Sequence, residues 1–553
     1  WMTKMTASRD YSKILASLDA KKDPELYKAS RNYVSDMLRN SDQHDRRIAW
    51  MKSLFFAKYL GASIKTPVLN LTQVIVAGTS RLSMETKRAD VRYLGTTGKM
   101  LVDALNGKKS LSMEQRRFLA EFYERGLSGA QFTEEVSGQI ARDPVASGWD
   151  RFVKLLGIPM AISERFNRTT VGLAAFNIAR EGKITNPATL KKFNKKKGQA
   201  FSYDEAMEFA KEINTDTNFD FGRHNRPEVV RAEKSPAIRY IAGTGYTFRF
   251  FTHNLLSLWK WQWKQGGTGQ QALLRSLAAV VAFGGLTSFP LYKTFMSLMR
   301  QMTGDDWEEK TVDKLLTDDE DMDWFRDMAL YGLPTIGGTT LGSSMSMELP
   351  VLARYRVDQS PTEQGARLFA ETLGIPYSML VDMERAMTAA YNRDPLRALE
   401  SILPPVAANP LRAHRAYSEG LYTHTGRPIV LPGETEPRRT SAPQAIAQAF
   451  GFQPVENQKS WEMSQKIGDL RAYKVRRQRH FADRMAKAVH EGDFKEVRQI
   501  AWEVAEWNRQ QAEAGRFEYI IDLKHSIATR MQGRQPPDYL RPYAQRLRQR
   551  AGM

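Results

Sequence analysis

Helix-start signals recur along the whole chain and limit its fold more than any other feature. A capping box at residues 112–115 precedes apolar residues spaced by three and four positions, and Gly126 follows as a stop signal. Similar starts occur at residues 202–205, at residues 441–444 and at Asp493. Because this spacing lines one face of a helix, and no convincing alternating strand pattern occurs, the sequence predicts an all-α, multi-segment protein with little or no β structure.

Composition changes along the 553 residues and divides them into five regions. Residues 1–150 form charged amphipathic helices, residues 151–270 an aromatic and basic helical region, and residues 271–355 a hydrophobic hairpin-like region with an acidic loop. Residues 356–440 are a helical connector rich in Pro and Gly, and residues 441–553 are a basic helical region. The best short strand candidate lies in the connector among prolines, so it does not alter the helical prediction.

The chain is strongly basic and contains no cysteine. Lys and Arg number 81 against 62 Asp and Glu, a formal net charge of +19 that favours a polyanionic partner, either nucleic acid or an anionic membrane. The lack of Cys excludes disulfides, thiolate zinc sites and cysteine nucleophiles. The eight His show no metal-ligand spacing, so we expect no metal and no cofactor. Since Trp1 stands where an initiator Met would, we expect the chain to be part of a longer protein.

Residues 471–484 are the strongest candidate for contact with nucleic acid. The segment holds six Lys or Arg against one acid, with Tyr473, His480 and Phe481 between them. On a helix, cations can follow a phosphate backbone without reading the bases, and we expect Lys474, Arg477 and Arg484 to share one face. The predicted DNA-contacting residues are Arg471, Lys474, Arg476, Arg477, Arg479 and Arg484. The alternative is a solvated helix face, or salt bridges to neighbouring acids.

Residues 276–292 raise the question of a membrane. They are seventeen residues without a charge, at the lower edge of the length that a spanning helix needs, and Gly284, Gly285 and Pro290 interrupt them. An aromatic and basic stretch precedes them, as suits a bilayer interface. The predicted membrane-interacting residues are Trp259, Trp261, Trp263, Leu277, Val280, Val281, Phe283, Leu286 and Phe289. The alternative is a core helix buried in a large helical protein.

The sequence contains no complete catalytic motif, and we expect this chain to have no enzymatic activity. Residues 95–99 resemble a phosphate-binding loop, but they have only two residues between the glycines and lack the Ser or Thr after Lys99. Glu164 could act as a general acid in a cell-wall lyase, yet no partner carboxylate is visible. An ion pair between Glu164 and Arg168, one helical turn apart, accounts for this residue more simply.

Five short segments resemble the C-terminal portions of very large phage proteins, known as polyvalent or internal virion proteins. They are residues 70–73 (NLTQ), 163–182 (SERFNRTTVGLAAFNIAREG), 247–259 (TFRFFTHNLLSLW), the run from 404 to 426, and 451–454 (GFQP). The segments are scattered between about residues 50 and 510, and none is as specific as a phosphate-binding loop.

The resemblance implies a role in delivering a genome. The giant chains of that family are packaged in the capsid of short-tailed phages and leave with the DNA, so this chain is expected inside the capsid or tail. This implies a helical, membrane-active ejection protein without enzymatic activity, found in the virion and later in the host periplasm or inner membrane. The implied partners are double-stranded DNA, the host inner membrane, portal or tail proteins and further copies of this chain. Two alternatives stay open: a segment of a virion RNA polymerase or peptidoglycan lyase, and a purely structural capsid or tail component.

Overall fold

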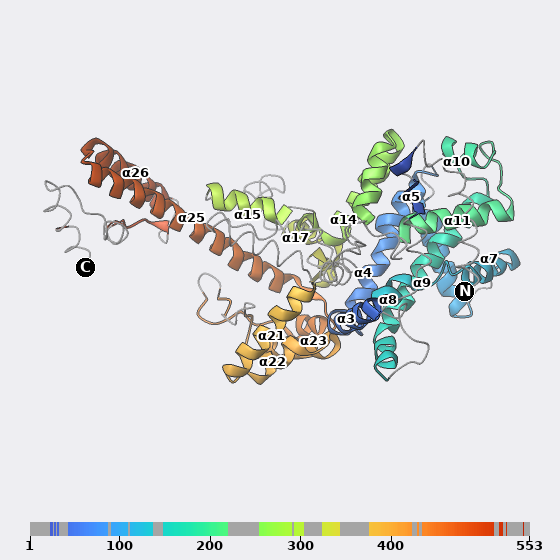
Figure 1. The fold of residues 1–553 in the computed structure, drawn as a ribbon, viewed down its shortest axis with the longest axis horizontal. Helices are drawn as coiled ribbons and strands as arrows, with labels where there is room; N and C mark the ends of the chain where they lie inside the picture. Colours follow the sequence, from blue (N-terminus) through green and yellow to red (C-terminus); the bar gives the residue numbers. More distant parts are fainter. Residues whose placement is uncertain are drawn as a thin grey trace.

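The computed structural model shows an elongated, mostly helical molecule with a broad body at one end and a long helical arm at the other (Figure 1). The residues it describes are 23–31 without 26 and 29, 43–86, 90–108, 111–136, 148–218, 254–289, 292–303, 323–342, 375–422, 428–430, 434–513, 519–523, 527 and 546. The all-α prediction is confirmed for this part of the chain. Its β structure consists of β1 (Thr339–Thr340) paired antiparallel with β2 (Gln453–Pro454), and one isolated bridge between Tyr422 and Pro428.

The body is built by the first half of the described chain. Its elements are α3 (Gln43–Tyr59), α4 (Lys65–Gln73), the π-helical segment η1 (Val74–Thr79), α5 (Ser80–Ser83), α6 (Asp90–Leu105), α7 (Met113–Glu124), α8 (Gln131–Val136), α9 (Gly148–Arg180), α10 (Pro187–Lys192) and α11 (Tyr203–Asn218). The predicted starts of two of these helices are confirmed. The Ser112 hydroxyl accepts from the Gln115 amide at the start of α7, and Ser202 pairs in the same way with Glu205 before α11.

Helix α9 is the centre of the body. Its C-terminal half is surrounded by α6, α7 and α11, and its side chains dominate the largest apolar core. Within this core, the Phe176 ring lies 4.4 Å from Phe118 and 5.4 Å from Tyr203, measured between ring centroids. A Cβ on Gly172 would stand 2.6 Å from the Phe122 ring, so only glycine lets α7 approach α9 this closely. Aromatic packing therefore fixes the body.

The middle of the molecule connects the body to the arm. Its elements are α14 (Gly267–Gly284), the short 3₁₀ turn η4 (Leu286–Ser288), α15 (Tyr292–Thr303), α17 (Asp323–Tyr331), the 3₁₀ turn η6 (Leu333–Gly337), α21 (Ile375–Tyr391), α22 (Pro395–Ile402), α23 (Pro405–Ser418) and α24 (Ala442–Ala449). A bidentate pair between Arg415 and buried Glu400, with N–O distances of 2.8 and 2.7 Å, joins α23 to α22. On the body side, the Lys58 ammonium donates to the carbonyls of Ser401 and Leu403.

The arm consists of α25 (Val455–Glu491) and α26 (Phe494–Glu513), which packs beside the far end of α25 (Figure 1). Helix α25 ends at Gly492, whose left-handed φ of 74° turns the chain back. The predicted helix start at Asp493 is confirmed, because its carboxylate accepts from the amides of Lys495 and Glu496. A small core that includes Phe481, Met485 and Ile500 holds the two helices together.

Candidate nucleic-acid interface

All six predicted DNA-contacting residues lie between residues 471 and 484 of α25, but they do not have equivalent surroundings. Arg471 and Arg479 are exposed, and Arg476 is half-buried. Residues 471 and 479 are eight positions apart, so they lie on one face two turns from each other. No acid of the described chain forms an ion pair with any of these three arginines. They leave positive charge on the outside of the arm.

Two of the three residues on the predicted face, Arg477 and Arg484, contact α26. The Arg484 guanidinium binds Glu503 and Glu496 of α26, both at 2.6 Å. The hydrogen bonds that Arg484 donates to Glu503 and Glu496 raise the pKa of Arg484, and the bond that Glu503 accepts lowers the pKa of Glu503. These contacts correspond to the salt-bridge alternative that the sequence left open. Contact of Arg484 with DNA stays a prediction that would require breaking both pairs.

Arg477 lies between two aromatic rings and keeps an exposed side. Its guanidinium carbon is 5.7 Å from the centroid of Tyr473 and 5.6 Å from that of Trp507 on α26, and its Nε donates to the Tyr473 hydroxyl at 3.3 Å. Arg476 also approaches the Tyr473 ring, at 5.7 Å. Cation–π contacts hold a guanidinium in place without neutralising it. The aromatic rings of the arm therefore position two cations that still carry their full charge.

The proximal half of α25 is fixed to α15 by a buried polar joint. The carboxylate of Asp469 accepts from Ser297 at 2.9 Å and from Gln301 at 3.3 Å, and it lies 3.4 Å from the Arg300 guanidinium. Asp469 and Arg300 are 7% and 5% exposed, so water screens this pair poorly. Two turns further toward the body, Glu462 accepts from the Tyr331 hydroxyl at 2.6 Å. The arm is thus held at its base by hydrogen bonds and charge.

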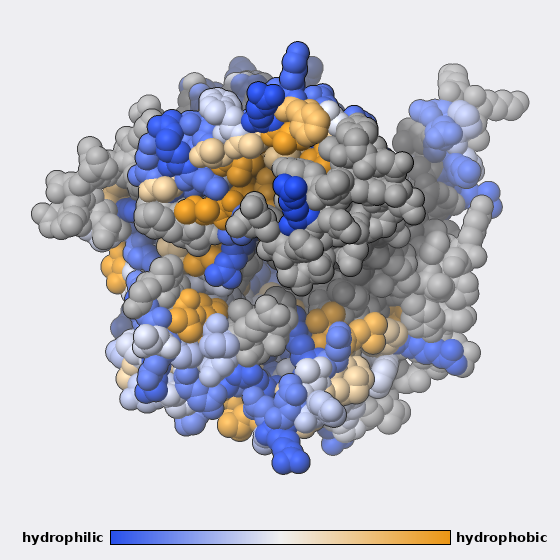
Figure 2. All heavy atoms as spheres, turned by 90° about the vertical axis from the view of Figure 1, so that its left-hand side faces the viewer, coloured by the Kyte–Doolittle hydropathy of each residue, from blue (hydrophilic) through white to orange (hydrophobic). Residues whose placement is uncertain are grey.

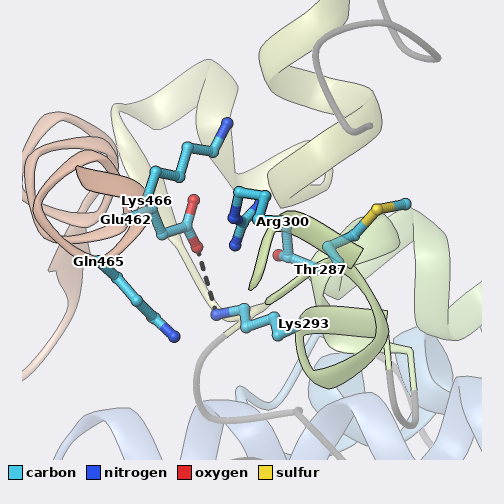
Figure 3. A pocket seen from close by; sticks show the side chains of 7 residues that line it. Thr287, Lys293, Arg300, Glu462, Gln465 and Lys466 are labelled. Carbon is cyan, nitrogen blue, oxygen red and sulfur yellow. Dashed lines mark ion pairs between the residues drawn. The ribbon is translucent and has the colours of Figure 1, made fainter. Parts of the chain in front are cut away.

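A small hollow lies beside this joint, between α15 and α25 (Figure 3). Three cations and one acid line it, and Lys293 reaches across to Glu462 at 3.3 Å (Figure 3). The other lining residues are Thr287, Met296, Arg300, Gln465 and Lys466. Because Lys293 and Arg300 are both bound by acids of α25, the hollow belongs to the structural joint.

The candidate membrane residues occupy two different environments. Trp259 is buried, and its indole N–H donates to the Ser276 hydroxyl at 2.8 Å, while Ser276 donates to the Val76 carbonyl. Val280 is fully buried against Val76 and its neighbours, with Leu277 packed at the edge of that cluster. The residues Val281, Phe283, Leu286 and Phe289 are half-buried, whereas Trp261 and Trp263 are exposed. This is the arrangement of the core-helix alternative.

Residues 276–292 do not form one continuous helix. Helix α14 ends at Gly284, and Gly285 adopts a left-handed φ of 72°. A Cβ at Gly285 would lie 2.1 Å from the Leu330 carbonyl oxygen, so α14 and α17 meet backbone to backbone. None of the helices in the described part of the chain has the length and apolar character needed to cross a membrane.

Both candidate catalytic motifs are part of helices and of the packing between them. Residues 95–99 lie inside helix α6 and form no loop. Glu164 is buried, and its carboxylate accepts from the Arg168 guanidinium at 3.4 Å and from the Thr133 amide at 3.0 Å. The predicted pairing of Glu164 with Arg168 is confirmed, with Thr133 as a partner that the sequence did not indicate.

Sequence reasoning missed the role of Trp507 beside Arg477 and the joint around Asp469. The spacing of Tyr473 and Arg477 by one helical turn was a usable signal for the first. Nothing in the local sequence links Asp469 to α15, because their positions differ by about 170 residues. No protein-family model, curated protein or solved structure matches the chain.

Proposed function

We propose that the chain is a non-enzymatic internal virion protein that leaves a phage particle with the genome, and that its arm contacts double-stranded DNA regardless of sequence. The observation that carries the DNA contact is a set of arginines on α25 to which the described chain offers no acidic partner, namely Arg471, Arg476, Arg477 and Arg479. Positive side chains on a rigid rod neutralise phosphates and release counterions, and this requires no reading of bases.

The geometry of the arm supports this contact. A helix rises about 1.5 Å per residue, so Arg471 and Arg479 stand about 12 Å apart along α25. The joint at Asp469 and the packing of α26 hold these cations in place before DNA arrives, which reduces the entropy lost on binding. At the end of the molecule that carries the arm, hydrophilic and apolar residues both reach the surface (Figure 2).

The wider role as part of a conduit for DNA includes a membrane step and several copies of the chain. In this proposal, α14 leaves its packing against η1 after ejection, and the segment from Ser276 onward then enters the host inner membrane. The support is the high apolar content of residues 276–292 and the exposed Trp261 and Trp263 beside Lys260 and Lys264. Portal or tail proteins are the partners expected inside the particle.

DNA binding is tested by removing the charges that have no acidic partner in the described chain. The triple variant Arg471→Gln, Arg476→Gln, Arg479→Gln should bind any duplex more weakly and flatten the slope of log affinity against log salt by about one unit for each phosphate that it no longer neutralises. The matched control removes three exposed cations from the body, Lys191, Lys196 and Lys197, and should leave most of the salt dependence intact. Unchanged affinity and slope in the arm variant would exclude α25 as the DNA site.

The membrane step is tested by dye release from anionic vesicles. Val281→Asp should reduce release, because a charge in the centre of a bilayer costs about 2.5–3.5 kcal/mol. Since Val281 is half-buried, the folded fraction of the variant is measured alongside by circular dichroism. If the wild-type chain releases no dye at any pH, the conduit role is wrong and a structural virion component becomes the better proposal. A catalytic domain found in the same polypeptide would favour the alternative of a large virion enzyme.

A further inference from the structure

The most exposed residues from position 64 to 79, along helix α4 and the segment η1, are all apolar. The exposed positions between residues 64 and 80 are spaced by four, three and four residues, so they line one face. They are Ile64, Val68, Leu71 and Ile75, exposed by 47%, 37%, 39% and 41%. A helix face that carries no charge is normally covered by another part of the protein, by a partner or by a membrane.

A second apolar stripe runs along the first half of α9. Its members are Phe152, Leu155, Ile158 and Ile162, exposed by 44%, 64%, 47% and 61%. The two helices lie side by side, because the Asn70 amide donates to Ser163 at 3.1 Å and Asn167 donates to the Asn70 carbonyl at 2.6 Å. Nearer the start of α9, the Ala62 amide donates to the Leu156 carbonyl at 2.8 Å.

Helix α6 shows that both stripes face the same side of this helix pair. A Cβ on Gly98 of α6 would lie 3.8 Å from Thr170 and 3.9 Å from Phe166 of α9. Phe166 and Thr170 come four and eight residues after Ile162, so they continue the same face of α9. A Cβ on Gly78, seven residues after Leu71, would lie 3.6 Å from Leu94 of α6 and 3.2 Å from Val171 of α9. Helix α6 therefore covers the continuation of both stripes and leaves their first halves open.

The end of α6 extends this open surface. Val102 and Leu105 follow Gly98 by four and seven residues and are 42% and 81% exposed. We name the whole surface the apolar face. It comprises Ile64, Val68, Leu71, Ile75, Val102, Leu105, Phe152, Leu155, Ile158 and Ile162.

The exposed charges in residues 91–105 of α6 and 151–165 of α9 are all positive. Helix α9 exposes Arg151, Lys154 and Arg165 between residues 151 and 165, and α6 exposes Arg92 and Lys99 between residues 91 and 105. No exposed acid lies in these two ranges or on α4. The acids nearby are half-buried, namely Asp103, Glu134 and Asp150. An apolar surface rimmed by cations matches the two features of an anionic bilayer, its acyl boundary and its negative headgroups.

We propose that the apolar face docks the body on the surface of an anionic membrane. A second copy of the chain is a poorer occupant, because two identical faces would bring the same cations together. The contact is peripheral and needs no rearrangement of α14. It rests on the proposed function for its biological setting, since that function brings the chain to a host membrane, but its test is independent of DNA binding and of insertion.

The test is flotation of the full chain with vesicles of phosphatidylcholine alone or mixed with phosphatidylglycerol. The wild type should bind the anionic vesicles, and Leu155→Gln with Ile162→Gln should weaken this binding by about tenfold. Lys154→Gln with Arg165→Gln should weaken it and reduce its dependence on salt. Because all four side chains are exposed, the variants should fold. The matched control, Leu380→Gln with Met387→Gln on α21, removes side chains of similar exposure, 62% and 66%, and should bind as the wild type does.

Three results would overturn the docking proposal. They are equal binding to neutral vesicles, an equal loss in the α21 control, and self-association of the wild type that the α9 variant abolishes in sedimentation equilibrium. The last result would assign the apolar face to a second copy. DNA affinity and dye release are also measured for the α9 variant, to separate the three proposals. Both should stay close to the wild-type values, because DNA affinity depends on Arg471, Arg476 and Arg479 and dye release depends on Val281. A chain that floats with anionic vesicles but binds no DNA would refute the proposed DNA contact and leave the docking surface standing.

Discussion

Helices α9 and α25 are similar in length, yet the molecule uses them in opposite ways. Seventeen of the 33 residues of α9 are buried, against twelve of the 37 of α25. The C-terminal half of helix α9 is enclosed by neighbours that pack through aromatic and aliphatic side chains, whereas α25 is held by a polar joint at its base and a small core near its tip. This difference indicates that apolar burial stabilises the body, while the charged surface of the arm remains available for a partner.

The largest expected effect breaks the aromatic packing of the body. Phe176→Ala removes a side chain that is 1% exposed and packed against the Phe118 ring, and it should lower the free energy of unfolding by about 3–5 kcal/mol. Urea denaturation followed by circular dichroism measures this loss. Phe494→Ala in the arm, where the ring is 50% exposed, is the control and should change stability by about 0.5 kcal/mol or less. Similar losses in both variants would contradict the contrast between body and arm.

The second effect loosens the joint between the arm and α15. Asp469→Asn replaces the buried carboxylate that faces Arg300, and hydrogen bonds to charged groups contribute about 1.5–3 kcal/mol. Hydrogen exchange should become faster in α15 and the proximal half of α25, with α9 unaffected. The control Glu491→Gln changes an exposed acid at the other end of α25, 3.9 Å from Lys487, and should leave the joint unchanged. Faster exchange across the whole body would show that arm and body unfold together.

A third, smaller effect compares two glycines of α25. Gly492→Ala places a side chain at a φ of 74° and should destabilise the turn into α26 by about 1–2 kcal/mol. Gly468→Ala, inside the helix with no atom within 4 Å of the new Cβ, should stabilise the arm by about 0.5–1 kcal/mol. Chemical denaturation of both variants gives the sign of each change. Destabilisation by Gly468→Ala would mean that the arm needs a bend there.

The smallest effect concerns pH, and its sign differs between the two regions. In the arm, the hydrogen bond from Arg484 lowers the pKa of Glu503, so the stability from this pair is present above the unfolded-state pKa and is lost as pH falls through the lower folded value. In the body, burial first and Glu164 second raise the pKa of Glu134. Its ionised form is therefore unfavourable near neutrality, and protonation relieves this as pH falls.

Two variants measured across pH make this comparison. Glu503→Gln should be less stable than the wild type at neutral pH, and the difference should shrink as the solution is acidified. Glu134→Gln should be more stable than the wild type at neutral pH, and this difference should also shrink on acidification. Differences that stay constant with pH would show that neither carboxyl titrates differently in the folded state.

Local sequence signals determined the helices and many of their ends. The capping residues Ser112, Ser202 and Asp493 satisfy amides within their own first turn, so their effect depends on neighbours a few positions away. The pair of Glu164 and Arg168 is local for the same reason. The all-α class and the basic character of residues 471–484 followed from such short-range information.

Tertiary structure decided which of these features face solvent. The sequence grouped Lys474, Arg477 and Arg484 on one face, and only the packing of α26 showed that this face meets Glu496, Glu503 and Trp507. Likewise, residues 276–292 carry an apolar pattern that fits a bilayer or a core, and contacts with Val76 and Leu330 place them among other helices. Periodicity gives the direction of a side chain around its own helix, but a partner that is distant in sequence determines whether that direction is open or covered.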